Sequence, residues 1–281
     1  MSDHPDTLVT TSWLAERLDD PSLRIIEIGA TGDDAEYRAG HVPGAIRFFW
    51  KDLCWHDTDR EFVTPGEMAD RLGAAGIGPS TTLVLYSDRV QYGTYGFWAL
   101  TMAGHRNLKL LDGSRTKWVS EGRPLATEFQ QFEAVPYPSP SADASSCVGR
   151  DNVLDNLGSA DRLLLDVRSP EEYSGERVMP PPGFDHGAER TGRIPGAVHL
   201  FYRDLVNDDD TYLSPDQLRD RFNAAGAAPD QTREVVTYCR LSHRATLAWF
   251  AMTRILGWDH VRIYDGSWTE WGSIVGFPIE K

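Results

Sequence analysis

Cys239 lies where the sequence predicts the end of a strand and the start of a helix. The segment VVTYCRLSHRATLAWF (235–250) combines a buried strand, a six-residue loop from Cys239 to Arg244, and a helix. Unpaired N–H groups and the dipole at a helix N-terminus favour an anion, so they favour the thiolate over the thiol. Arg240 and Arg244 add positive charge. The loop therefore predicts a nucleophilic sulfur.

The elements around this loop belong to an internal repeat. GHVPGAIRFFWKDLC (40–54) is matched by GRIPGAVHLFYRDLV (192–206), 152 residues later. Two further pairs of blocks keep nearly that spacing, namely 71–87 with 221–239 and 111–125 with 264–279. We therefore expect a tandem duplication. The expected parts are a first domain over 1–125, a linker over 126–150 and a second domain over 151–281.

Short apolar runs alternate with helix-like stretches in both copies, which predicts parallel sheets covered by helices on both faces. Expected strands are 23–28, 81–87, 163–167, 234–239 and 261–265, and expected helices are 11–18, 214–226 and 245–257. Ligands of such sheets bind beyond the carboxyl ends of the strands, where Cys239 is placed. The second copy also has a Pro- and Gly-containing insertion over 174–191, which we expect to be an exposed loop.

The other two cysteines do not share this setting. Cys54 stands at a repeat position where the second copy has Val206, which indicates packing, and Cys147 lies in the expected linker. Because three cysteines make no disulfide framework, we expect free thiols in a reducing cytoplasm.

The bulk composition excludes some classes of function. A net charge of −14 and a pI of about 4.9 argue against a nucleic-acid surface. The sequence has no apolar run long enough to predict a membrane span, and its first residues do not have the pattern of a secretory signal.

At this point the motifs resemble a known family. The cysteine loop, the two G-[HR]-[VI]-P-G-A blocks, DVRSPEEY (166–173) and YDGSWTEW (264–271) resemble the tandem-domain rhodaneses, which are thiosulfate and 3-mercaptopyruvate sulfurtransferases. The motifs are most similar to those of the actinobacterial thiosulfate sulfurtransferases. The resemblance implies an α/β fold of two tandem rhodanese-like domains, each with a central parallel sheet, of which only the second is catalytic. In the first copy Ser87 replaces the cysteine.

The resemblance also implies a mechanism. Cys239 would take sulfur from a small anionic donor as a persulfide and pass it to cyanide or a thiol, without a metal or organic cofactor. The substrate-binding residues would be the rest of the loop together with Arg168, namely Arg240, Leu241, Ser242, His243, Arg244 and Arg168. Arg168 has a second interpretation, a structural pair with Asp166, and His243 is a candidate proton partner. Asp112 in the first copy and Asp265 in the second begin the same DGS segment, and we expect both to be turn and helix-cap residues.

Three alternatives remain open at this stage. Glu172 stands where animal rhodaneses have a donor-binding arginine, which leaves 3-mercaptopyruvate as a possible donor. A persulfide carrier for a biosynthetic partner would use the same cysteine. A cysteine phosphatase would need five residues between Cys and Arg, whereas four separate Cys239 from Arg244, so this class is disfavoured.

Overall fold

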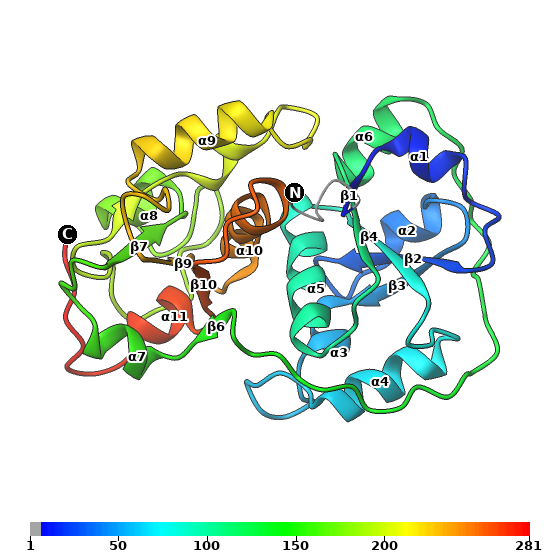
Figure 1. The fold of residues 1–281 in the computed structure, drawn as a ribbon, viewed down its shortest axis with the longest axis horizontal. Helices are drawn as coiled ribbons and strands as arrows, with labels where there is room; N and C mark the ends of the chain where they lie inside the picture. The colour runs from blue at the N-terminus through cyan, green and yellow to red at the C-terminus, as the bar shows by residue number, and fades with distance from the viewer. Residues whose placement is uncertain (1–6) are drawn as a thin grey trace. The chain divides into compact units, whose positions relative to one another are not determined.

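The computed structural model describes residues 7–281, and residues 1–6 of the first expected domain lie outside the described part. The chain divides into two compact units, one of residues up to 144 with 208–211, and one of residues 145–207 with 212–281. Each unit has a five-stranded sheet in which every neighbouring pair of strands is parallel (Figure 1). The expected α/β class, with two central parallel sheets, is confirmed.

The first sheet has the strand order β1-β5-β4-β2-β3. Its strands are β1 (Leu8–Val9), β2 (Leu23–Gly29), β3 (Ala45–Phe49), β4 (Thr82–Ser87) and β5 (Leu108–Leu111). The helices of this unit are α1 (Thr11–Ala15), α2 (Ala35–Ala39), α3 (Trp50–Cys54), α4 (Pro65–Ala74), α5 (Val90–Met102) and α6 (Ser114–Ser120).

The second sheet repeats this order as β6-β10-β9-β7-β8. Its strands are β6 (Cys147–Val148), β7 (Arg162–Asp166), β8 (Val198–His199), β9 (Glu234–Tyr238) and β10 (Val261–Tyr264). Its helices are α7 (Arg150–Asp155), α8 (Pro170–Ser174), α9 (Pro215–Ala224), α10 (His243–Phe250) and α11 (Ser267–Trp271), with a 3-10 turn η1 (Tyr202–Leu205) and a π turn η2 (Ala251–Ile255).

Both faces of each sheet are covered by apolar side chains of the helices. In the first unit Leu14 of α1, Tyr37 of α2 and Trp118 of α6 pack in one cluster with the sheet. In the second unit Trp268 and Trp271 of α11 have the corresponding place. Figure 1 shows α5 and α10 along the sheets of their own units. Such two-sided cover explains the continuous apolar runs of the central strands.

The duplication extends to single hydrogen bonds. The amide of Val42 donates to the Tyr86 hydroxyl at 3.2 Å, and the amide of Ile194 donates to the Tyr238 hydroxyl at 3.2 Å. These tyrosines directly precede Ser87 in the first copy and Cys239 in the second. The two copies therefore align without ambiguity at the ends of β4 and β9.

The expected linker and the expected helix after Cys239 differ in extent from the structure. Near the end of the expected linker, Cys147 and Val148 form the edge strand β6, which pairs with β10. The helix after Cys239 begins at His243 and passes into η2 at Ala251. Sequence periodicity does not detect a two-residue edge strand, because so short a strand has no pattern of its own.

Candidate active site

Cys239 follows β9 directly, and four residues, 239–242, connect this strand to α10. The expected loop of six residues is thus shorter, because His243 and Arg244 already belong to the first turn of the helix. The Cys239 side chain is a free thiol with 1% exposure. Within the described residues, its Sγ atom has no hydrogen-bond partner, and the amides of Arg240 and Leu241 have none either. A negative charge at Sγ would therefore lie beside unpaired amides and a helix N-terminus.

Ser267, the first residue of α11 after the neighbouring strand β10, holds the loop in place. Its hydroxyl oxygen accepts from the amides of Cys239 and Ser242, each at 3.2 Å, and donates to the Tyr264 carbonyl at 2.8 Å. Ser242 and Ser267 have φ values of 58° and 52°, a region that side chains other than glycine rarely adopt. Backbone strain of this kind is typical of functional sites.

A second contact joins the cysteine loop to the segment that follows β10. The Ser242 hydroxyl donates to Asp265 Oδ1 at 2.7 Å. The sequence suggests only a turn or cap role for Asp265, and it does not single out Ser267. The sequence nevertheless contains a signal for both residues. The DGS segment follows the strand that neighbours β9 in a parallel sheet, so this segment must lie beside Cys239.

His243 and Leu241 are joined within the loop itself. The His243 amide donates to the Leu241 carbonyl at 2.8 Å, and His243 as a whole residue is 7% exposed. The structure thus places both residues at the loop. Their expected contact with a substrate stays a prediction.

Arg244 forms a buried ion pair with Glu172 of α8. Its Nη1 donates to Oε2 at 2.6 Å and its Nη2 donates to Oε1 at 2.8 Å. Glu172 is fully buried and Arg244 is 8% exposed. Burial alone would lower the pKa of Arg244, but the Glu172 carboxylate and the nearby Cys239 outweigh it and raise that pKa. Glu172 is thus a partner of the loop arginine.

Arg240 has a different environment. In the described part of the chain no carboxylate lies within ion-pair distance of its guanidinium, and Nη1 lies 3.4 Å from the His186 carbonyl oxygen. His186 belongs to the insertion over 174–191, which is anchored in turn by Arg190. The Arg190 guanidinium donates to four carbonyls, those of Trp271, Gly272, Ile274 and Phe277. The insertion therefore supports the one loop arginine whose charge is not compensated by a carboxylate.

Arg168, the one expected substrate-binding residue outside the cysteine loop, lies away from solvent beside Asp166. It is fully buried, with Nε and Nη2 on the Asp166 carboxylate at 2.6–3.0 Å and Nη2 also on the Gly192 carbonyl at 2.8 Å. Burial acts to lower the pKa of Arg168, but Asp166, Tyr238 and Glu172 together raise it by more. The first unit, which has no such cysteine, keeps an equivalent pair between Glu27 and Arg47 at 3.7 Å. The environment of Arg168 therefore favours a structural role, as the ion-pair partner of Asp166.

In the first unit, Ser87 ends β4 where Cys239 follows β9. Its amide donates to Ser114 Oγ at 2.8 Å, as Cys239 does to Ser267. Its hydroxyl is bound locally, accepting from the Gly93 amide at 3.0 Å and donating to the Arg89 carbonyl at 2.5 Å. Ser87 is thus tied into the start of α5.

Neither of the other cysteines has a comparable loop. Cys54 is fully buried at the end of α3, and Cys147 lies in the edge strand β6. Residues 7–281 contain no group of three potential ligands for a metal ion. In the same residues no helix is long and apolar enough to cross a membrane.

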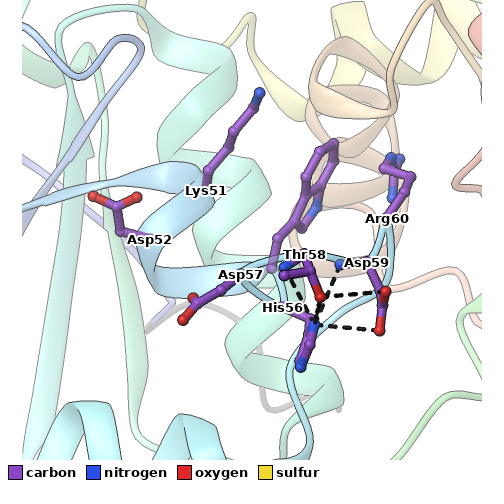
Figure 2. Close-up of a pocket in the computed structure, with 8 residues that line it drawn as sticks. Lys51, Asp52, His56, Asp57, Thr58, Asp59 and Arg60 are labelled. Atoms are coloured by element: carbon purple, nitrogen blue, oxygen red, sulfur yellow. Dashed lines mark hydrogen bonds and ion pairs between the residues drawn. The ribbon is translucent and has the colours of Figure 1, made fainter.

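A separate open pocket of about 450 Å³ lies on the first unit, around the loop that follows α3 (Figure 2). Its cations, Lys51 and Arg60, both stand over the Trp55 ring, at 5.5 and 3.9 Å from its centre. His56 contacts Asp59 at 3.3 Å. The pocket has mixed charges and no cysteine among its lining residues.

Comparison with known proteins assigns the chain to one family. The family model described as Rhodanese-like domain matches residues 10–121 and again residues 150–274. The chain belongs to the rhodanese family of sulfurtransferases and contains two copies of its domain.

Individual relatives are similar over their whole length. The chain is 40% identical to "Sulfur carrier protein TtuD" of Thermus thermophilus over 99% of this chain and 98% of that protein. It is 36% identical to "Putative thiosulfate sulfurtransferase" of Saccharopolyspora erythraea, over 98% and 96% of the two chains. Among solved structures, an anaerobic ergothioneine biosynthesis enzyme from Chlorobium limicola superposes with a TM-score of 0.84 at 25% identity, over 99% of this chain and 71% of that one.

Proposed function

We propose that the chain transfers the sulfane sulfur of thiosulfate through a persulfide on Cys239 to cyanide or a thiol. The Cys239 thiolate attacks the outer sulfur of thiosulfate, the S–S bond of the donor breaks, and sulfite leaves with the bonding electron pair. The acceptor then attacks the outer sulfur of the persulfide and the Cys239 thiolate is restored. With cyanide as acceptor the product is thiocyanate. Each step exchanges one S–S or S–C bond, so no external oxidant or reductant is needed.

The position of Cys239 is the observation that carries this proposal. The cysteine follows a buried strand and precedes a helix N-terminus, and in the described residues the amides of Arg240 and Leu241, which come next in the loop, have no hydrogen-bond partner. These groups would stabilise the anionic sulfur of both the thiolate and the persulfide, as preorganised donors do in oxyanion sites. Ser242, which is fixed by Asp265, would keep the amides in that arrangement.

Arg240 would bind the sulfonate end of the donor, because its guanidinium is not compensated by a carboxylate. Arg244 would act mainly by holding the start of α10 through Glu172. The buried Arg168 would take no part in donor binding. A role of His243 as proton partner remains a separate prediction, which a His243→Gln variant tests through the pH dependence of kcat.

Thiosulfate is the proposed donor because an arginine stands directly after the cysteine. The compact sulfonate end of thiosulfate suits charge-assisted hydrogen bonds from a guanidinium, whereas 3-mercaptopyruvate presents a planar keto-carboxylate. The test is kcat/KM for both donors with one common acceptor. A tenfold advantage for 3-mercaptopyruvate, about 1.4 kcal/mol in transition-state binding, would overturn the donor assignment.

A sulfur-carrier role is the second candidate, and the name of the Thermus thermophilus relative favours it. A carrier would hold the same persulfide and release it to a protein partner. It would be distinguished by slow turnover with cyanide and small thiols despite rapid loading. The cysteine phosphatase alternative gains no support, because Cys239 and Arg244 enclose only four residues.

Mass spectrometry of the intact chain after thiosulfate treatment tests the proposal. We expect a gain of about 32 Da that maps to Cys239 and is removed by cyanide. The Cys239→Ser variant should show no gain. A stable adduct elsewhere, or none in the unaltered chain, would contradict the proposed function. The cytoplasmic location expected from the free cysteines stays a prediction.

A further inference from the structure

The buried carboxylate of Glu172 stands next to the loop of an enzyme expected to bind anions. We propose that Glu172 is a positioning residue that lowers the affinity of the loop for anions, by compensating the charge of Arg244, so that sulfite can leave. This inference rests on the proposed function. In this inference, one acidic side chain sets how tightly the loop binds the donor and how readily it releases the product.

The geometry of the pair leaves little of Arg244 for a ligand. Two of its nitrogens are occupied by the two oxygens of one carboxylate, at 2.6 and 2.8 Å. Such a bidentate pair is the strongest arrangement that arginine forms with a carboxylate. An incoming anion would have to displace a fully buried Glu172 to reach these nitrogens.

Glu172 is itself held by contacts with Ser169. Its Oε2 accepts from the Ser169 amide at 3.0 Å, and its own amide donates to Ser169 Oγ at 3.4 Å. This reciprocal capping box, with Pro170 in the first turn, begins α8. The same carboxylate therefore caps the start of α8 and neutralises the first turn of α10.

The charges at the loop follow from these contacts. Arg240 and Arg244 bring two positive charges, and Glu172 removes the effect of one. The donor, thiosulfate, enters as a dianion and the product, sulfite, leaves as a dianion. Both are bound beside the anionic sulfur of Cys239. Two uncompensated guanidinium groups would hold both dianions tightly, and tight binding of the product slows turnover. One uncompensated guanidinium gives weaker binding and faster release.

The first unit supports a link between the buried acid and the cysteine. Glu36 precedes Tyr37 in α2 as Glu172 precedes Tyr173 in α8, and both tyrosines donate to a carbonyl of the following β-segment, Ala45 or Ala197. Glu36, however, is exposed. A buried acid at this position therefore occurs in the copy that has the cysteine loop, and the fold does not need it.

The primary test is Glu172→Gln, which keeps the size of the side chain and removes its charge. We expect KM for thiosulfate to fall about fivefold or more and sulfite to become a stronger product inhibitor by a similar factor, while kcat falls. A residue with only a structural role would raise KM or leave it unchanged when altered. Glu171→Gln is the matched control, because it removes a neighbouring carboxylate outside the pair, and it should change none of these values.

A second variant guards against misfolding. Glu172→Gln/Arg244→Gln replaces the ion pair by a neutral pair and so leaves no buried charge alone. The net charge at the loop equals that of the unaltered chain, so KM for thiosulfate should stay within about threefold of its original value. A large rise in KM in this double variant would show that Arg244 binds the donor directly, and would overturn the inference.

These outcomes separate the inference from the proposed function. Absence of a persulfide on Cys239 in the unaltered chain contradicts the proposed function. Normal persulfide formation, combined with an unchanged or raised KM in Glu172→Gln, contradicts only the role of Glu172.

Discussion

The loops after β4 and β9 occupy the same place in two copies of one domain, and their first residues differ in the sign of their charge. In the first unit Ser87 is followed by Asp88, whereas in the second Cys239 is followed by Arg240. Asp88 is turned inward, and its carboxylate accepts from the Ala30 amide at 3.1 Å. Arg240 instead extends to the insertion, with Nη1 3.4 Å from the His186 carbonyl.

The serines that hold these two loops, by contrast, have nearly the same contacts and backbone conformation. Ser114 accepts from the Ser87 amide and Ser267 from the Cys239 amide, and each has a left-handed backbone, with φ of 51° and 52°. The duplicated fold thus supplies the platform in both units. The side chains placed on it, together with one additional loop residue before the helix, decide whether the platform can stabilise an anionic sulfur.

The largest expected difference between the loops concerns the nucleophile. Cys239→Ser should reduce thiocyanate formation from thiosulfate and cyanide to background, because a hydroxyl cannot form a persulfide. Cys54→Ser and Cys147→Ser should leave most of the activity. Ser87→Cys in the Cys239→Ser background should not restore it, since Asp88 follows that position. Restored turnover would show that the platform alone is sufficient.

The next largest effect concerns the arginines of the second loop. Arg244→Ala leaves the buried Glu172 without a cationic partner and should destabilise the second unit by about 3–5 kcal/mol. Arg240→Ala removes an arginine that has no ion pair among the described residues, so it should change stability by about 0.5 kcal/mol at most while raising KM for thiosulfate. Chemical denaturation and steady-state kinetics of both variants check this. Equal stability losses would mean that the two arginines have equivalent environments.

The matched serines of the two turns give a smaller effect. Ser267→Ala removes the acceptor of two amides in the cysteine loop and should cost about 1–3 kcal/mol of stability. It should also lower kcat/KM by about tenfold, since the loop is no longer fixed. Ser114→Ala should destabilise the first unit to a similar degree without a change in kcat/KM. A loss of activity in Ser114→Ala would contradict the view that only one platform serves the reaction.

The smallest effect is a pH dependence confined to the first unit. Burial raises the pKa of Glu27 and of Asp88. A carboxyl group whose pKa is raised on folding favours the folded state when protonated, so the first unit should lose stability as pH rises from about 4.5 through these raised values. The loss is about 1.4 kcal/mol per pH unit at most for each group.

Hydrogen exchange of β2 and β4 amides between pH 5 and pH 7 measures this dependence. Glu27→Gln should make it shallower in the first unit and leave the amides of β7 and β9 unaffected. An identical slope in the variant would show that Glu27 does not titrate in this range.

The sequence is sufficient to predict the repeat, the parallel sheets and the cysteine between strand and helix. These features are encoded locally, in apolar runs and in turn residues next to each other in the chain. The repeat also assigns Cys54 to packing, because Val206 has the same place in the other copy. Full burial of Cys54 agrees with that interpretation.

The contacts of the loop are less accessible to prediction. Glu172 and Arg244 are separated by 72 residues, and nothing in either local segment indicates that one contacts the other. In the sequence, Glu172 stands where animal rhodaneses have a donor-binding arginine, whereas in the structure its carboxylate is paired with Arg244. Periodicity places the start of α10 two residues too late, because Ser242 adopts a left-handed conformation that no glycine signals.

The paired acid and arginine in the sheets have a consequence for sequence variation within the family. In the first unit the cation of the pair comes from β3, as Arg47, and fills the space over Gly29, where an added Cβ would lie 2.2 Å from Nη2. In the second unit the cation comes from the position equivalent to Gly29, as Arg168, and the position equivalent to Arg47 is His199. The two sites should therefore covary: related domains should carry an arginine at one of them and a residue that leaves room at the other. A paired exchange, Gly29→Arg with Arg47→His, should be better tolerated than either substitution alone.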